Sequence, residues 1–258
     1  MTKIIKSVLE WKNVHSSNKL FRKSLGFVPT MGALHDGHVS LFRKSIEENE
    51  CTVVSIFVNP TQFNDPDDLQ NYPRVIEEDL KILEASGVDY LFYPAYKEIY
   101  NDSYRYRVCE TMFSKHLCGE FRIGHFEGVL TVVLKLLNII KPSKAYFGEK
   151  DFQQYKLIDD MTKALFIDTE IVSCPIIRDK DGLALSSRNL LLTEEERKLV
   201  SNFPRILNSG KSYIEMKLEL EVLGIKVDYI EEYAGRILGA INIGKVRLID
   251  NVPLQNTN

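Results

Sequence analysis

Residues 29–38 read PTMGALHDGH, and they follow the short apolar run LGFV at 25–28. The run predicts a buried strand, and apolar residues at helical spacing over 39–46 predict a helix after it. The glycines and histidines therefore lie in the turn between them. Glycine lets a ligand approach the backbone, and a helix N-terminus offers unpaired N–H groups and a positive dipole end. The turn favours a phosphate site contacted by His35 and His38.

The alternation of strand and helix continues along the chain. An apolar run at 51–59 predicts a fully buried strand, and residues 75–87 predict an amphipathic helix that ends at a glycine C-cap. A largely apolar helix at 125–140 is expected to lie against a sheet on one side and against another helix or a partner subunit on the other. Further strands are predicted at 88–94, 144–148 and 169–177. Repeated units of this kind predict an α/β fold, a Rossmann-like doubly wound parallel sheet that binds ligands at the carboxyl ends of its strands.

The sequence changes character after this pattern. A polar loop at 178–192 precedes a capping box at 193–196 that opens a helix. Two helical segments and two short strands, at 226–233 and 244–251, complete a small α+β region. We therefore predict a Rossmann-like domain over 1–176 and a smaller C-terminal domain over 177–258.

Composition narrows the class of protein. Lys and Arg total 33 against 36 Asp and Glu, a net charge of −3 that argues against a dedicated nucleic-acid binder. Charges interrupt the N-terminal apolar residues, and the longest apolar stretch, at 128–140, is too short to span a bilayer. We expect a cytoplasmic protein that does not enter a membrane. Four cysteines without CxxC spacing are expected to be reduced and buried: Cys51, Cys109, Cys118 and Cys174.

Two other predicted strand ends carry polar residues. Asn59 and Gln62 follow the strand at 51–59, and amides bind hydroxyls and carboxylates without a counter-charge. Gly148 ends the strand at 144–148, and three further candidates follow it: Lys150, Asp151 and Gln154. Lysine suits a phosphate, and aspartate binds ribose hydroxyls. Each stretch taken alone is also typical of an ordinary surface turn.

The polar loop contains LALSSRN at 183–189, which places two hydroxyls and a guanidinium in succession. A flexible loop of this composition can close over phosphates during a reaction. A loop of this composition is also typical of a surface linker. In the same way, His35 and His38 taken alone are compatible with ordinary loop histidines.

In this order and at these separations, the four motifs resemble those of the pantoate-β-alanine ligase family. The resemblance extends through 125–142 and 246–251, so it covers nearly the whole chain, and PTMGALHDGH also resembles the HxGH signature of the nucleotidyltransferase superfamily. It implies that the carboxylate of (R)-pantoate attacks the α-phosphorus of ATP and expels pyrophosphate. The amine of β-alanine then attacks the bound pantoyl adenylate and gives pantothenate and AMP. A homodimer and Mg²⁺ on the ATP phosphates are also implied, with no protein ligand assigned to the metal.

The resemblance assigns a role to each matching position. His35 and His38 stabilise phosphate charge, and His38 takes the position of a proton donor. The β and γ phosphates with Mg²⁺ are held by Lys150, Ser186, Ser187 and Arg188. Pantoate and β-alanine are bound by Gln62, Gln154 and Asn59. The expected ATP contacts are Met31, Gly32, Ala33, Leu34, His35, Asp36, Gly37, His38, Gly148, Glu149, Lys150, Asp151, Ile177, Leu185, Ser186, Ser187 and Arg188. The C-terminal domain is expected to act as a lid.

The chain departs from the family pattern in three places. Leu185 stands where a methionine is usual, Ile123 stands where many relatives have proline, and a hairpin is shortened between Tyr233 and Arg236. Only the last bears on the geometry of the lid. Two other functions stay open: a nucleotidyltransferase that makes a different product, and a non-catalytic nucleotide- or tRNA-binding module. The module would require a basic face and the loss of phosphate ligands.

Overall fold

The structure is a computed structural model that describes residues 1–17 and 24–254. It divides into two compact units, Met1–Glu149 with Gln153–Cys174 and Lys150–Phe152 with Pro175–Asn258. The division therefore falls between Cys174 and Pro175, close to the predicted boundary after residue 176, and it assigns a short segment containing Lys150 to the second unit.

A six-stranded parallel sheet forms the centre of the first unit, with strand order β1-β4-β3-β2-β5-β6. The strands are β1 (Lys3–Ile5), β2 (Leu25–Thr30), β3 (Cys51–Ile56), β4 (Tyr90–Phe92), β5 (Lys144–Gly148) and β6 (Glu170–Cys174). The predicted Rossmann-like doubly wound sheet is confirmed. β1 was not predicted, because three residues are too few to show a periodicity.

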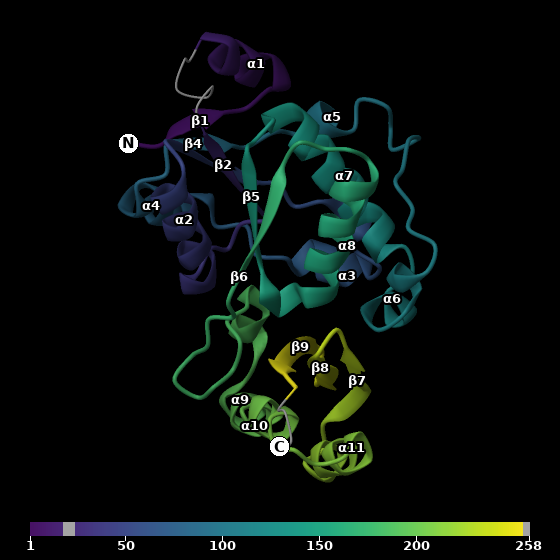
Figure 1. The fold of residues 1–258 in the computed structure, drawn as a ribbon. Helices are drawn as coiled ribbons and strands as arrows, with labels where there is room; N and C mark the ends of the chain where they lie inside the picture. The colour runs from purple at the N-terminus through teal and green to yellow at the C-terminus, as the bar shows by residue number, and fades with distance from the viewer. Residues whose placement is uncertain (18–23, 255–258) are drawn as a thin grey trace. The chain divides into compact units, whose positions relative to one another are not determined.

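Helices cover both faces of this sheet (Figure 1). α2 (Asp36–Glu48) and α4 (Ile76–Ser86) lie on one face, and α7 (His125–Ile140) and α8 (Phe152–Ala164) lie on the other. The expected C-cap is confirmed, since Gly87 has φ 79°. The shorter helices of this unit are α1 (Val8–Ser17), α3 (Pro66–Asn71), α5 (Tyr96–Ile99), α6 (Cys118–Phe121), η2 (Pro60–Gln62), η3 (Phe113–Lys115) and η4 (Glu149–Asp151), of which η4 continues into the second unit.

The apolar circumference of α7 is largely covered by the chain itself. The helix contacts β2, and it also contacts α1, α5 and η2. Only Asn138 on its outer side is exposed, next to the half-buried Leu134, Lys135 and Ile139. Neighbouring elements of the same unit therefore account for most of the apolar surface predicted for this helix.

The strand order reverses between β2 and β5, because β3 and β4 lie on one side of β2 and β5 and β6 lie on the other. Thr30 is level with Ile56 of β3, and Gly26 is level with Lys144 of β5. The carboxyl ends of these three parallel strands therefore meet at one edge of the sheet, where such folds bind ligands.

The second unit contains a three-stranded antiparallel sheet of β7 (Lys226–Tyr233), β8 (Arg236–Ile243) and β9 (Val246–Pro253). Its helices are η5 (Ser187–Leu191), α9 (Glu194–Val200), α10 (Asn202–Leu207) and α11 (Tyr213–Val222). The predicted capping box at Thr193 and Glu196 is confirmed, and so is the small α+β architecture. β8 and one helix were not predicted. The segment with the shortened hairpin is a two-residue turn in which Ala234 and Gly235 have φ 50° and 73°, the sign of φ that closes a regular hairpin.

All four cysteines are free thiols, but the expectation that they are buried is wrong for one of them. Cys51, Cys118 and Cys174 are buried, whereas Cys109 is exposed. Cys109 belongs to an extended loop rather than to a strand or helix, so no second layer of structure covers it.

Candidate active site

A buried carboxylate holds the loop between β2 and α2. Asp79 of α4 is 1% exposed, and its two oxygens accept hydrogen bonds from the backbone N–H groups of Ala33 at 3.0 Å and Leu34 at 2.7 Å. Burial raises the pKa of the Asp79 carboxyl, and the two backbone donors oppose that rise. Gly32 has φ 83°, and a Cβ there would lie 2.9 Å from an Asp79 oxygen. Asp79 thus fixes the path of the glycine-containing turn.

The two histidines cap the helix that follows. The Nδ1 atom of His35 accepts a hydrogen bond from the Gly37 N–H at 3.1 Å, and the Nδ1 atom of His38 accepts one from the His35 N–H at 3.3 Å. A ring nitrogen that accepts carries no proton, so each neutral ring has its proton on Nε2. The ring centroids are 4.1 Å apart. The sequence motif therefore builds two adjacent N–H donors at a helix N-terminus.

Gln62 lies beside this loop and is oriented by Asn59. The Gln62 Nε2 atom is 3.2 Å from the Met31 sulfur, and its Oε1 accepts a hydrogen bond from Asn59 Nδ2 at 3.0 Å. Asn59 is fully buried, and its Oδ1 accepts a hydrogen bond from the Tyr100 hydroxyl at 2.8 Å and others from Thr61. The amide of Asn59 is thus engaged inside the protein, which favours a supporting role over contact with a substrate.

The carboxyl end of β5 has open space beside Gly148, and of the two glutamines that follow it only Gln154 is a candidate to bind a substrate. A Cβ added to Gly148 would meet no atom within 4 Å. Gln153 is buried, and its amide is hydrogen-bonded to the backbone of Phe113, His116 and Cys118. Gln154 is half-buried, and it is the member of the pair whose side chain is not used to anchor a loop.

Lys150 belongs to the second unit, where β9 anchors it. Its carbonyl accepts a hydrogen bond at 3.2 Å from Nδ2 of Asn251, which is 2% exposed. The Asn251 side-chain oxygen in turn accepts a hydrogen bond from Arg236. The Lys150 side chain is 19% exposed, and its Nζ lies 3.8 Å from a carboxylate oxygen of Asp151. The main chain that carries this lysine is therefore fixed by a buried amide.

The polar loop predicted at 178–192 is an ordered turn followed by η5. The Leu185 N–H donates a hydrogen bond to the Ile177 carbonyl at 2.9 Å, which brings these two candidates together. Ser186 caps η5 by accepting a hydrogen bond from the Arg188 N–H at 3.2 Å, and Ser187 is the first residue of η5. The exchange at Ile123 falls on a side chain that is 84% exposed in the first unit, where no packing depends on it.

Each unit thus gathers part of the predicted site. In the first unit His35 lies against His38, and Met31, Gln62 and Asn59 form a chain of contacts. Asp36 is exposed on the first turn of α2. Asp79 had no motif to mark it, and Asn251 lies in the stretch 246–251 that carries the resemblance but had no role assigned to it, because each acts on the backbone of a residue far away in the sequence.

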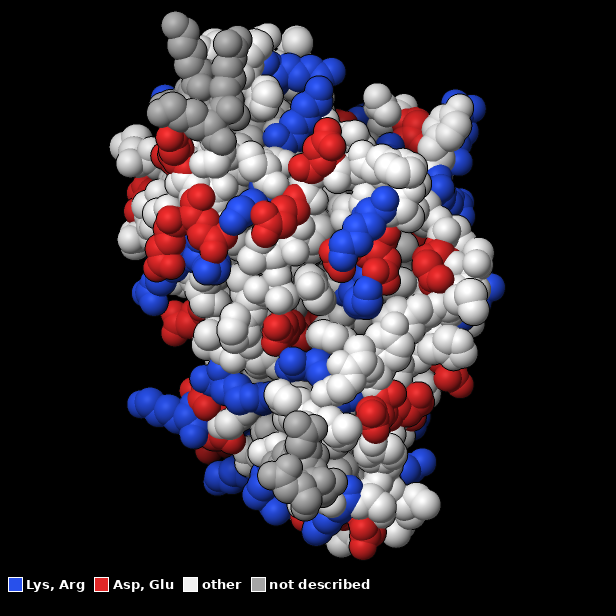
Figure 2. All heavy atoms as spheres, viewed as in Figure 1, with Lys and Arg blue, Asp and Glu red and all other residues white. Residues whose placement is uncertain are grey.

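Charge and metal-binding residues are distributed without large clusters. Figure 2 shows basic and acidic residues interspersed, with no continuous basic stripe on the face in view. Within residues 1–17 and 24–254, no three His, Cys, Asp or Glu side chains gather as a metal site. Over the same residues, every helix is too short or too polar to cross a bilayer.

Comparisons with known proteins agree with this geometry. A family model described as pantoate-beta-alanine ligase matches residues 3–253. The chain is 52% identical over 249 residues to a pantothenate synthetase of Legionella pneumophila strain Philadelphia 1, covering 96% of this chain and 98% of the relative. It is 47% identical over 254 residues to a pantothenate synthetase of Coxiella burnetii strain RSA 331, and the match covers 98% of this chain and 97% of the relative.

Solved structures of pantoate-β-alanine ligases and pantothenate synthetases have a similar fold. The crystal structure of pantoate-beta-alanine ligase from Francisella tularensis, complexed with beta-gamma ATP and beta-alanine, aligns with TM-score 0.93 at 43% identity and 98% coverage of both chains. The pantothenate synthetase of Thermus thermophilus aligns with TM-score 0.88 at 36% identity, covering 98% of this chain and 99% of that one. The ligase prediction is confirmed over the two alternatives: this chain belongs to the pantoate-β-alanine ligase family.

Proposed function

We propose that this chain joins (R)-pantoate to β-alanine in two steps, with ATP as the activating substrate. Pantoate attacks the α-phosphorus of ATP and releases pyrophosphate, and β-alanine then displaces AMP from the pantoyl adenylate to give pantothenate. The family match over residues 3–253 carries this proposal. The Francisella tularensis relative supports it, because that protein was crystallised as a complex with beta-gamma ATP and beta-alanine.

The substrates supply both nucleophiles, so the protein has to align them and neutralise phosphate charge. The Nε2–H groups of His35 and His38 act as donors to phosphate oxygens at the N-terminus of α2, where the helix dipole also favours an anion. His38 is the proton donor in this scheme. The open space at Gly148 accommodates the ribose, whose hydroxyls Asp151 binds.

The second unit supplies the remaining phosphate ligands. Lys150, Ser186, Ser187 and Arg188 bind the β and γ phosphates, and Ile177 and Leu185 contact the adenine end. Mg²⁺ would be held on the ATP phosphates, whose oxygens are hard ligands suited to it, and it would neutralise the charge that develops there. We further propose that this unit closes as a lid, because an exposed acyl adenylate would hydrolyse. The cytoplasm, where ATP is available, is the proposed location.

A pyrophosphate assay tests this function directly. The protein is mixed with ATP, Mg²⁺ and pantoate, and pyrophosphate is measured before β-alanine is added. We expect pyrophosphate that depends on pantoate, followed by AMP and pantothenate after β-alanine is added. Pyrophosphate release at the same rate without pantoate would contradict the proposal.

Gln62→Ala is expected to weaken pantoate binding with little effect on ATP affinity. The Gln62 amide is held by Asn59 and Met31 and is uncharged, which suits a hydroxy acid better than a triphosphate. Loss of a typical hydrogen bond weakens binding about three- to tenfold. Isothermal titration calorimetry with each substrate measures this, with the exposed Gln70→Ala as the matched control. The reverse pattern of affinities would assign Gln62 to the nucleotide.

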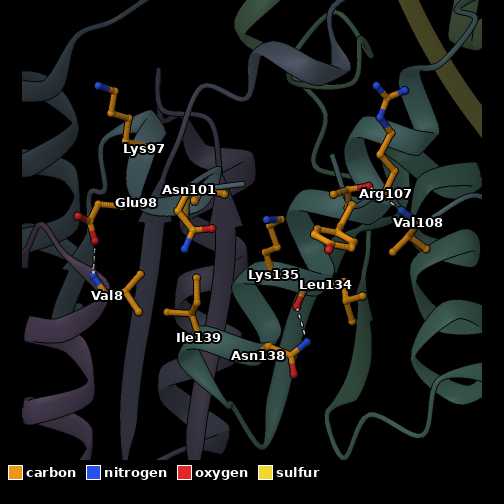
Figure 3. A pocket seen from close by; sticks show the side chains of 13 residues that line it. Val8, Lys97, Glu98, Asn101, Arg107, Val108, Leu134, Lys135, Asn138 and Ile139 are labelled. Atoms are coloured by element: carbon orange, nitrogen blue, oxygen red, sulfur yellow. Dashed lines mark hydrogen bonds between the residues drawn. The ribbon is translucent and has the colours of Figure 1, made fainter. Parts of the chain in front are cut away.

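We also propose a homodimer formed through the first unit. A hollow of about 640 Å³ lies beside the outer stripe of α7, lined by Leu134, Lys135 and Ile139 and by residues of α5 and the loop after it (Figure 3). Its mixed apolar and charged lining is compatible with contact to a second copy. Sedimentation equilibrium distinguishes a monomer from a homodimer. A monomer at micromolar concentration would contradict a stable dimer.

A further inference from the structure

The short helix that carries Gln62 rests directly on the first turns of α7. Gly128 makes this possible, because a Cβ on it would lie 2.3 Å from the carbonyl oxygen of Thr61. The Gly128 carbonyl also accepts a hydrogen bond from Asn59 Nδ2 at 3.2 Å. Backbone packs against backbone here, so any shift of α7 at this point is transmitted to Gln62.

Two side chains then hold the Gln62 backbone. His125, the first residue of α7, is 6% exposed, and its Nδ1 lies 2.8 Å from the Gln62 carbonyl oxygen. Its Nε2 lies 3.0 Å from Nη1 of Arg122, whose Nη2 also donates a hydrogen bond to the Gln62 carbonyl at 3.4 Å. All three residues belong to the first unit.

The direction of these hydrogen bonds follows from the chemistry of the donors. A guanidinium can only donate, so His125 Nε2 accepts and its proton lies on Nδ1. That Nδ1–H points at the Gln62 carbonyl, which can only accept. Arg122 thus fixes the tautomer of His125, and His125 fixes the position of Gln62.

We propose that Arg122 and His125 are positioning residues for pantoate, acting through Gln62. This inference rests on the proposed function, in which Gln62 orients the carboxylate that attacks ATP. Arg122 and His125, which we call the clamp, hold the Gln62 backbone, while Asn59 holds the Gln62 side-chain amide. Small displacements of such a group lower the rate because attack requires alignment.

Paired substitutions of His125 test the clamp. His125→Gln removes the donor at the Nδ1 position, whereas His125→Asn keeps an N–H donor there. We expect His125→Gln to raise the pantoate KM about three- to tenfold with the ATP KM unchanged. His125→Asn is expected to bring the pantoate KM most of the way back to the wild-type value. Arg122→Gln, on a residue that is only half-buried, is expected to shift the pantoate KM in the same direction.

A double-mutant cycle separates positioning from a general structural effect. In a Gln62→Ala background the additional effect of His125→Gln on the pantoate KM is expected to vanish, because the side chain that it positions is gone. An undiminished effect there, or equal rises in both KM values, would overturn the inference while leaving the ligase function intact. A wild-type protein that releases no pantoate-dependent pyrophosphate would instead overturn the proposed function, and the inference with it.

Discussion

Lys150→Ala is expected to lower kcat/KM for pantoate-dependent pyrophosphate release by about a hundredfold, as removal of a preorganised charge donor does. The Lys150 side chain is 19% exposed, and its main chain is tied to β9 by Asn251. A largely buried lysine on an anchored main chain would need little reorganisation to bind the phosphate that the proposed function assigns to it. Steady-state kinetics with ATP and pantoate measure the loss, and thermal unfolding is expected to be unchanged.

Lys163→Ala is the matched control for this prediction. Lys163 lies on α8, is 70% exposed and pairs with Asp159 one turn away, an arrangement that contributes little to stability. Its removal is expected to leave turnover unchanged. If Lys150→Ala also turned over normally, Lys150 would not be a phosphate ligand, and the charge on the leaving pyrophosphate would have to be met by other residues.

Two long elements of the fold were predictable because burial gives each of them a continuous apolar run. The run at 51–59 and the helix at 125–140 are buried over most of their length, and the structure places β3 and α7 there. β8 was missed because Arg236, Gly239 and Asn242 interrupt its apolar residues. Although most of the strand is buried, it shows neither a continuous apolar run nor an alternation of apolar and polar residues.

The candidate site divides in the same way. His35, His38 and Gln62, the side chains proposed to contact the substrates, follow predicted strands, so motif and position pointed to them. The residues that hold the site act on backbone groups across the chain. Asp79 binds the N–H of Ala33, 46 residues earlier, and Asn251 binds the carbonyl of a residue 101 positions away. No local spacing encodes such a contact, and only the folded chain reveals it.

Asp250→Ala is expected to destabilise the second unit by about 3 kcal/mol, the lower end of the cost of breaking a buried ion pair by removing one partner. The Asp250 side chain is 2% exposed, and its oxygens accept two hydrogen bonds from Arg178, at 2.7 and 2.9 Å. One oxygen also accepts the Asn251 N–H at 2.7 Å. The substitution leaves the buried Asn251 N–H without its acceptor and removes the carboxylate that pairs with Arg178, whose guanidinium keeps its hydrogen bonds to the carbonyls of Gly182 and Asn251.

Hydrogen exchange followed by mass spectrometry measures this effect in β8 and β9, where faster exchange is expected in the variant. Glu219→Ala is the control, because it removes surface ion pairs with Arg205 and Lys211, which contribute little to stability. Asp250 also adjoins Asn251, so Asp250→Ala is expected to loosen the anchor of Lys150 and to lower pyrophosphate release. A variant with unchanged exchange but reduced activity would show that Asp250 acts on the reaction itself rather than through the stability of this sheet.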